Sequence, residues 1–173
     1  MDDMVILVDK NDNELGMKEK LEVHVSGLLH RAVSVFIFNR NNELLLQKRA
    51  VTKYHSGGLW TNTCCSHPKP NELTKDAANR RLKEEMNLTS NLIFSHSFYY
   101  YVNLDNGLFE HELDHVYIGY SDEKPKIDHH EASDWKYMNI EELNKDIIVN
   151  PDAYSSWLKI CLKDVLLKVN NKL

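Results

Sequence analysis

The chain has 173 residues, of which 42% are hydrophobic and 27% charged, so we expect one soluble globular domain over residues 1–173. Its formal net charge of −5 and the absence of a Lys/Arg-rich block argue against binding to nucleic acid. No apolar run approaches the roughly 20 residues that span a membrane, and the acidic start Met1-Asp2-Asp3-Met4 does not resemble a secretion signal. Three cysteines, two of them adjacent, make a poor disulfide framework. We therefore expect a cytoplasmic protein without membrane partners.

The first half of the chain predicts short strands and one long loop. Met4–Val8 indicates a strand, and the β-rich runs Val33–Phe38 and Leu44–Gln47 flank a polar turn at residues 39–42, which predicts a hairpin. The stretch Ala50–Leu73 predicts an irregular loop, because it contains the breakers Gly57, Gly58, Pro68 and Pro70. Loops of that length in compact domains are usually functional.

A helix and further strands follow this loop. Thr74 can cap a helix to about Asn87, whose apolar stripe is Ala77, Ala78, Leu82 and Met86. Two strands are expected at Ile93–Val102 and Leu108–Tyr120, and Asn106-Gly107 between them is a strong tight-turn signal. Trp135–Met138 is another strand candidate.

The chain ends in a pattern typical of a long amphipathic helix. Asn150 is a good N-cap and Pro151 suits the first helical position. One face is apolar over Tyr154, Trp157, Leu158, Cys161, Leu162, Val165, Leu166 and Val169. Because strands and helices mix without a regular βαβ alternation, we expect an α+β or sandwich-like arrangement.

Two glutamates and several histidines could bind metal. Glu110 and Glu112 lie two apart in a predicted strand, so both carboxylates leave one face of the sheet. An exposed charged pair is the commoner interpretation, but hard oxygen ligands also suit a divalent cation. With the imidazoles of His24, His30 and His67 they would favour manganese or zinc. Each histidine taken alone is more often structural, and that interpretation stands for His96, His111, His115, His129 and His130.

The helix that begins near Thr74 offers both cations and carboxylates. Arg80–Glu84 and Arg81–Glu85 have i, i+4 spacing, which is typical of a salt-bridged surface. Alternatively, Arg81 and Glu85 point together toward the long loop, where a guanidinium and a metal-bound carboxylate could address a phosphate. Cys65 in the loop is either a buried thiol or a reactive one.

Five strings in this order resemble the type I isopentenyl-diphosphate delta-isomerases of the Nudix superfamily: Leu28–Phe36, Leu44–Ala50, Trp60–Pro68, Glu110–Glu112 and Tyr154–Trp157. The helix region also resembles a degenerate Nudix box, which is matched at Glu72, Arg80, Glu84, Glu85 and Leu88 and departs from the pattern at Ser66, Arg81 and Asn87. Arg81 replaces a carboxylate that Nudix hydrolases use to bind catalytic metal.

The resemblance implies a Nudix-like mixed β-sheet sandwiched by helices. It also implies an enzyme that interconverts isopentenyl diphosphate and dimethylallyl diphosphate by metal-dependent protonation and deprotonation of the alkene. Cys65 and Glu112 match the catalytic pair, Tyr100 an assisting hydroxyl and Trp157 an aromatic wall.

Two metal sites and an anion site follow from the same resemblance. The manganese or zinc ligands would be His24, His30, His67, Glu110 and Glu112. Glu85, with the carbonyl of Cys65, matches the ligands of a magnesium ion that also holds the diphosphate of the small-molecule prenyl substrate. The cations around that diphosphate would be Lys20, Arg49, Lys53 and Arg81.

Two alternatives belong to other classes of function. A Nudix hydrolase of a diphosphate substrate is disfavoured by the arginine at position 81. A non-catalytic Nudix-like binding module is disfavoured because Cys65, Glu112 and the metal-ligand matches are all present.

Overall fold

The computed structural model describes residues 4–170. The chain ends at 1–3 and 171–173 lie outside the described residues, and so does most of the acidic start on which the expectation about secretion depends. In chain order, the strands and helices of residues 4–170 are β1 (Met4–Val8), β2 (Glu14–Glu19), α1 (Lys20–Ser26), β3 (His30–Phe38), β4 (Glu43–Arg49), β5 (Trp60–Thr61), β6 (Cys64–Ser66), α2 (Thr74–Met86), β7 (Ile93–Asn103), β8 (Phe109–Tyr120), β9 (Ala132–Asn139), α3 (Ile140–Val149) and α4 (Ser156–Asn170).

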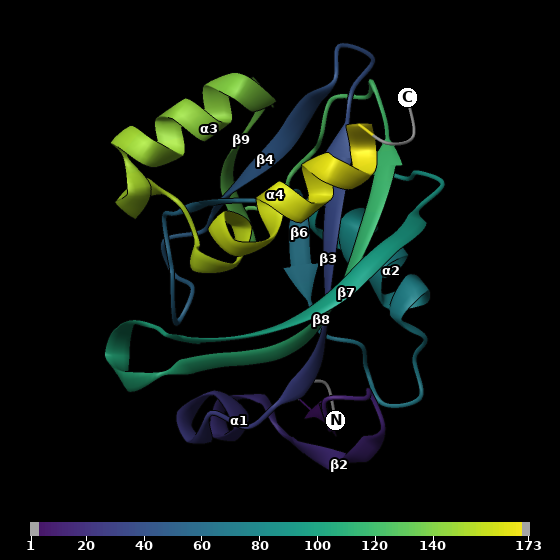
Figure 1. Cartoon of the computed structure of the whole chain (residues 1–173), viewed down its shortest axis with the longest axis vertical. Coiled ribbons are helices and arrows are strands. Elements are labelled where there is room, and N and C mark those ends of the chain that lie inside the picture. The colour runs from purple at the N-terminus through teal and green to yellow at the C-terminus, as the bar shows by residue number, and fades with distance from the viewer. Residues whose placement is uncertain (1–3, 171–173) are drawn as a thin grey trace.

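The strands form a mixed sheet in which β3 is the central element (Figure 1). β3 runs parallel to β8, with His30 opposite Glu112, and antiparallel to β6, with Ser34 opposite Cys65. β7 pairs antiparallel with β8, and Tyr100 stands opposite Glu112. The register therefore places Glu112, Tyr100 and Cys65 beside the N-terminal half of β3, which is where the predicted site residues meet.

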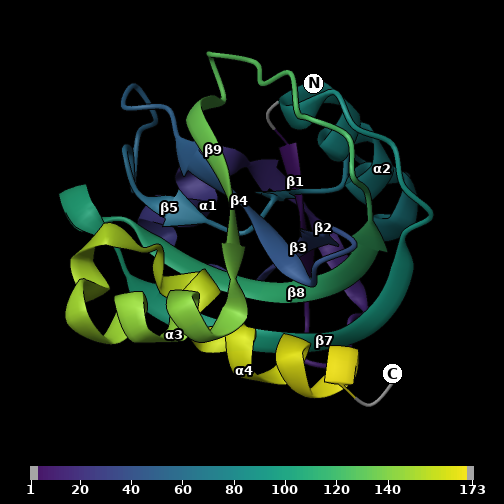
Figure 2. The ribbon, with the colours of Figure 1, turned by 90° about the horizontal axis from the view of Figure 1, so that it is seen from above.

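Helices cover both faces of the sheet, and the period-2 alternation of β3 explains how. Val33, Val35 and Ile37 pack in one apolar cluster with residues of α2. Phe36 and Phe38 point the other way and pack in a second cluster with residues of α3 and α4. Figure 2 shows α2 on one side and α3 with α4 on the other. This confirms the expected α+β fold with a mixed sheet between helices.

The strands and turns that the sequence predicts are present in the structure. β1 covers Met4–Val8 as predicted, and the polar turn between β3 and β4 closes a hairpin with Phe38 opposite Leu44. Asn106 and Gly107 have φ of 61° and 72° and turn β7 back into β8. Positive φ is the reason that this dipeptide predicts a tight turn.

Two predicted helix starts are wrong. Thr74 is the first residue of α2 rather than its cap; Leu73 occupies the cap position, and the Thr74 hydroxyl lies 2.7 Å from that of Tyr117. Pro151 begins a short 3₁₀ turn, Pro151–Ala153, after which Tyr154 is extended and α4 starts at Ser156. Pro151 is therefore the first residue of a 3₁₀ turn and not of the long helix.

The loop predicted over Ala50–Leu73 is not wholly irregular. β5 and β6 lie within it, and β6 pairs with β3, which places Cys65 against the central strand. The sequence also did not predict α1, β2 or α3. No helix in residues 4–170 is long and apolar enough to cross a membrane.

Candidate active site

The histidines and glutamates of the predicted metal site converge from α1, β3, β8 and the segment after β6. Glu110 and Glu112 leave the same face of β8 and are both buried. Nε2 of His24 lies 3.3 Å from Oε2 of Glu110, and Nε2 of His67 lies 2.9 Å from Oε1 of Glu112. His30, the first residue of β3, places Nε2 3.6 Å from the same Glu112 oxygen. The structure thus brings all five side chains together.

The backbone fixes which nitrogen of two of these imidazoles faces the cluster. Nδ1 of His24 lies 2.7 Å from the carbonyl oxygen of Lys20, and Nδ1 of His30 lies 2.9 Å from that of Leu28. Because a carbonyl oxygen only accepts, each neutral ring carries its proton on Nδ1 and directs the Nε2 lone pair inward. Nε2 of His30 and Nε2 of His67 are only 3.1 Å apart.

This donor set fits a metal ion. Metal–nitrogen and metal–oxygen bonds of about 2.1 Å put neighbouring ligand atoms roughly 3 Å apart in an octahedral shell. The contacts within the cluster, from 2.9 to 3.6 Å, match that spacing. Nε2 of His24 and Oε2 of Glu110 are buried without a hydrogen-bond partner among the described residues. Ligand atoms of His24, His30, His67 and Glu112 all lie within 4.8 Å of one another.

A fourth histidine lies beside this cluster and was not predicted. His55, in the segment between β4 and β5, is buried, and its Nε2 lies 3.3 Å from Oε1 of Glu110. His24, His55 and Glu110 form a second group of possible ligands. Burial lowers the pKa of His55 to about 2, so its ring is neutral. The only sequence signal was its place in the loop that was expected to be functional.

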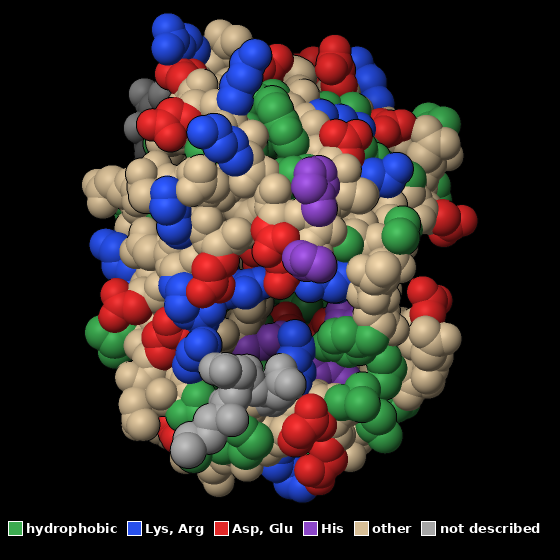
Figure 3. All heavy atoms as spheres, turned by 180° about the vertical axis from the view of Figure 1, so that it is seen from behind, with side chains coloured by type: hydrophobic (Ala, Val, Ile, Leu, Met, Phe, Trp, Pro, Cys, Tyr) green, Lys and Arg blue, Asp and Glu red, His purple; other side chains and the backbone are tan. Residues whose placement is uncertain are grey.

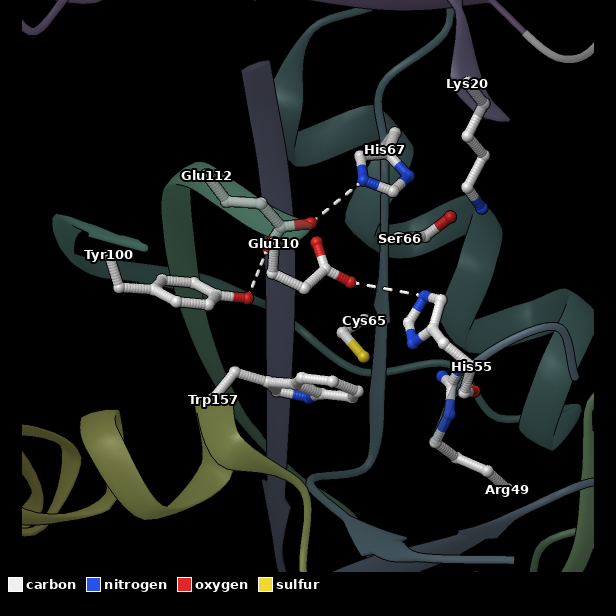
Figure 4. A pocket seen from close by; sticks show the side chains of 10 residues that line it. All are labelled: Lys20, Arg49, His55, Cys65, Ser66, His67, Tyr100, Glu110, Glu112 and Trp157. Atoms are coloured by element: carbon white, nitrogen blue, oxygen red, sulfur yellow. Dashed lines mark hydrogen bonds and ion pairs between the residues drawn. The ribbon is translucent and has the colours of Figure 1, made fainter. Parts of the chain in front are cut away.

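The acid and base candidates line a small cavity of about 40 Å³ next to these ligands (Figure 4). Tyr100 donates its hydroxyl to Oε2 of Glu112 at 2.7 Å, on the side away from His67. Burial alone would raise the pKa of Glu112, but the adjoining imidazoles of His30 and His67 outweigh it and hold the pKa well below its usual range. Burial raises the pKa of the Cys65 thiol, which is therefore protonated.

Trp157 forms an aromatic wall of the same cavity. It is 2% exposed and comes from the first turn of α4, so it is at once a buried residue and a pocket wall. The guanidinium carbon of Arg49 lies 5.3 Å from its ring centroid, within cation–π range. Its indole Nε1 has no hydrogen-bond partner in the described part of the chain.

A larger cavity of about 440 Å³ opens beside the small one and is rich in cations. Figure 3 shows a hollow with Lys and Arg side chains along part of its rim and His side chains inside. The two cavities share Lys20, Arg49, Cys65, Ser66 and His67 as lining residues. The further cations of the large cavity are Lys53, Lys69, Arg80 and Arg81. All four cations predicted to surround a diphosphate therefore line it.

Acidic side chains hold the cations of this cavity in place. Arg81 forms ion pairs of 2.8 Å with both Glu84 and Glu85, and one of 3.0 Å with Glu131. Glu131 also pairs with Lys53. Burial raises the pKa of Glu85, although Arg81 opposes the shift. Glu131 was not predicted, because it stands in sequence far from both of its partners.

Other histidines have structural partners. Nδ1 of His111 lies 2.9 Å from the carbonyl oxygen of Gly27, and Nε2 of His115 lies 3.0 Å from a carboxylate oxygen of Asp12. The structural interpretation of His111 and His115 agrees with these contacts.

All three cysteines are free thiols, and Cys64 and Cys161 are buried in opposite apolar clusters.

Comparisons with known proteins show the family of the chain. The model of the NUDIX domain matches residues 28–158. Isopentenyl-diphosphate Delta-isomerase 2 from Aromatoleum aromaticum is 50% identical over 96% of this chain and 88% of that protein. Isopentenyl-diphosphate Delta-isomerase from Pectobacterium atrosepticum is 51% identical over 90% of this chain and 87% of that protein.

Solved structures show the same fold at low sequence identity. A Deinococcus radiodurans protein matches with a TM-score of 0.75 and 17% identity, over 92% of this chain and 98% of the other. A MutT NUDIX hydrolase from Burkholderia pseudomallei matches with a TM-score of 0.63 and 17% identity, over 78% and 96%. The chain therefore belongs to the NUDIX family and, within it, to the isopentenyl-diphosphate Delta-isomerases.

Proposed function

We propose that the chain interconverts isopentenyl diphosphate and dimethylallyl diphosphate. The names of its relatives support this activity, and one structural observation carries it for this chain. A small cavity with a thiol, a carboxylate and an indole adjoins a larger cationic cavity, and Cys65, Ser66 and His67 line both. This shape suits a short apolar alkene attached to a diphosphate.

We assign two metal ions to the residues present. His24, His30, His67, Glu110 and Glu112 would hold manganese or zinc, because imidazole nitrogen and carboxylate oxygen together suit these ions. Glu85 and the carbonyl oxygen of Cys65 would hold magnesium, which prefers oxygen ligands and substrate phosphates. When bound, the ions supply positive charge that keeps the buried carboxylates ionised and attracts the diphosphate.

Proton transfer in the small cavity is assigned to Cys65 and Glu112. One group adds a proton to the terminal CH₂ carbon of the alkene, which leaves positive charge on the adjoining tertiary carbon. The other group removes a proton from the carbon on the far side, and a double bond forms there. The roles exchange in the reverse direction, and the Tyr100 hydroxyl on Oε2 of Glu112 assists the carboxyl. An unactivated alkene is a weak base, so it needs a placed acid in a dry pocket.

Trp157 stabilises the positive charge formed on carbon. A tertiary carbocation accepts no hydrogen bonds, but an indole face offers it a cation–π attraction of about 2 kcal/mol when desolvated. Lys20, Arg49, Lys53 and Arg81 hold the diphosphate in the larger cavity.

A single domain over residues 1–173 and a cytoplasmic location stay predictions from the sequence.

Incubation of the protein with isopentenyl diphosphate, magnesium and manganese tests this proposal. We expect acid-labile allylic product and no stoichiometric release of phosphate. A hydrolase would instead release phosphate or diphosphate without allylic product, and that result would contradict the isomerase. Arg81 argues against hydrolysis, because its guanidinium is engaged by Glu84, Glu85 and Glu131 where hydrolases have a metal-binding carboxylate.

A further inference from the structure

The two oxygens of Glu110 face different partners. Oε2 lies 3.3 Å from Nε2 of His24 inside the proposed metal site and has no hydrogen-bond partner among the described residues. Oε1 lies 3.3 Å from Nε2 of His55, on the other side of the carboxylate (Figure 4). A carboxylate placed in this way can bind a metal ion through one oxygen while a neighbour holds the other.

His55 is placed to act on Glu110 from outside the metal site. Its Nε2 groups with ligand atoms of His24 and Glu110, and neither His55 nor Glu110 belongs to the group of His24, His30, His67 and Glu112. The two oxygens separate their roles: the unpartnered Oε2 of Glu110 faces His24, a member of that group, whereas His55 contacts Oε1. Such outer contacts fix the orientation of a ligand and tune its basicity.

Neighbouring side chains fix the orientation of the His55 ring. The ring stacks on His24 at 5.7 Å between centroids and meets Tyr54 and Trp157 edge-on at 4.5 and 6.1 Å. Nδ1 lies 3.3 Å from the hydroxyl of Ser56, which can donate to it and so leave the proton on Nε2. That tautomer directs an N–H at Oε1 of Glu110.

The same residue also connects the metal ligands to the substrate cavity. The carbonyl oxygen of His55 accepts a hydrogen bond from Nη2 of Arg49 at 3.3 Å. Arg49 lies over the ring of Trp157 and lines both cavities. One loop residue thus contacts a metal ligand, the aromatic wall and a diphosphate cation.

We propose that His55 is a positioning residue that holds Glu110 through Oε1, so that Oε2 stays directed at the metal ion. This role rests on the proposed metal site and extends it by a residue outside the motifs that carry the family resemblance. It requires a hydrogen-bond donor at position 55, not only an aromatic ring that fills the space.

Titration of the metal-free protein with Mn²⁺, followed through the electron paramagnetic resonance signal of free Mn²⁺, tests this role without any turnover. His55→Phe keeps a ring but has no donor, and we expect its affinity for Mn²⁺ to fall about 10- to 100-fold. His55→Gln keeps an N–H donor and should bind within a few-fold of the unmodified chain. His96→Ala is the control for loss of a histidine, since His96 is half-buried and lies on β7 outside both ligand groups.

Each result of the Mn²⁺ titration either supports or contradicts the positioning role of His55. Unchanged affinity in His55→Phe would overturn the role, and so would an equal loss in His55→Phe and His55→Gln. If His55→Phe does not fold, as judged by its melting curve, His55→Ala replaces it in the same comparison. Failure of the unmodified chain to bind Mn²⁺ would overturn the metal site together with this role, whereas binding that is insensitive to position 55 overturns the role alone.

Discussion

The two cavities share a wall but differ in how their functional groups are held. Beside the small cavity, His24 and His30 are fixed by backbone carbonyl oxygens, and Glu112, which lines it, has partners on both oxygens. In the large cavity, flexible side chains such as Arg81 and Lys53 are paired with carboxylates that a bound anion can replace. Fixed groups suit a reaction that needs one geometry, and paired cations suit an anchor for a charged group.

This difference predicts which substitutions change kcat and which change KM. Changes in the small cavity should lower kcat, because they remove groups that act on the reacting carbons. Changes in the large cavity should raise KM, because they weaken binding that is equal in the ground state and the transition state.

Removal of metal should have the largest effect, because it leaves the buried carboxylates and imidazoles of the small cavity without their common partner. We expect dialysis against a chelator to abolish isomerisation, and manganese or zinc together with magnesium to restore it. The initial rate is measured beside the metal content and the melting curve. Full activity in a preparation shown to be metal-free would contradict the proposed sites.

Cys65→Ser should nearly match that loss. A hydroxyl is a much poorer acid or base than a thiol, and placed acid–base groups contribute about 10²- to 10⁴-fold. Cys64→Ala is the control, because Cys64 packs in the apolar cluster beneath α2 and should affect the melting temperature more than kcat. Equal kcat for Cys65→Ser and the unmodified protein, with both folded, would remove Cys65 from the mechanism.

Lys53→Met tests the larger cavity and should act mainly on KM. Loss of one cation near the diphosphate should raise KM by roughly 10-fold, equivalent to about 1.4 kcal/mol, with kcat changed little. Lys145→Met, an exposed position on α3, controls for net charge. A fall in kcat at constant KM would show that the division between the cavities is wrong.

Glu131→Gln should give the smallest effect, seen in acid stability. Burial would raise the pKa of Glu131, but Lys53 and Arg81 together lower it from 4.5 to about 2. Because the folded pKa lies below the unfolded one, this carboxylate stabilises the fold above pH 4.5, and the contribution is lost as the pH falls toward 2. We expect the variant to lose about 1 kcal/mol at neutral pH and to show a flatter pH dependence in that window. Coincident unfolding curves from pH 7 to 2 would contradict the pairing.

Strong local patterns were sufficient to predict much of the fold. The alternation in β8 placed Glu110 and Glu112 on one face, and Asn106-Gly107 marked the turn before it. Both signals depend only on neighbours in sequence, so tertiary contacts do not alter them. The same holds for β1, whose bounds were predicted.

Elements that depend on distant contacts could not be predicted. β6 has three residues, too few to show a period, and it is a strand because β3 pairs with it. α1 spans only 7 residues, too few to establish a helical period, and α3 spans only 10. α3 nonetheless had a usable signal, since Asn139 caps it and Glu141 and Glu142 occupy its first turn.

The parts of the site that depend on contacts between distant residues could not be predicted either. The family resemblance indicated five candidate metal ligands, a candidate catalytic pair and four candidate phosphate-binding cations, and the structure brings these side chains together in and beside two adjoining cavities. His55 and Glu131 lie outside those motifs, and their importance comes from contacts with Glu110 and Arg81 across the fold. No spacing in the sequence encodes such contacts.

Incubation of the protein with isopentenyl diphosphate in D₂O tests the central claim most directly. If Cys65 and Glu112 add a proton on one side of the alkene and remove one on the other, solvent deuterium must enter the carbon that becomes a methyl group. We predict dimethylallyl diphosphate labelled at that methyl, and labelled substrate once the reaction has reversed. Dimethylallyl diphosphate formed without deuterium would contradict proton addition and removal by these residues.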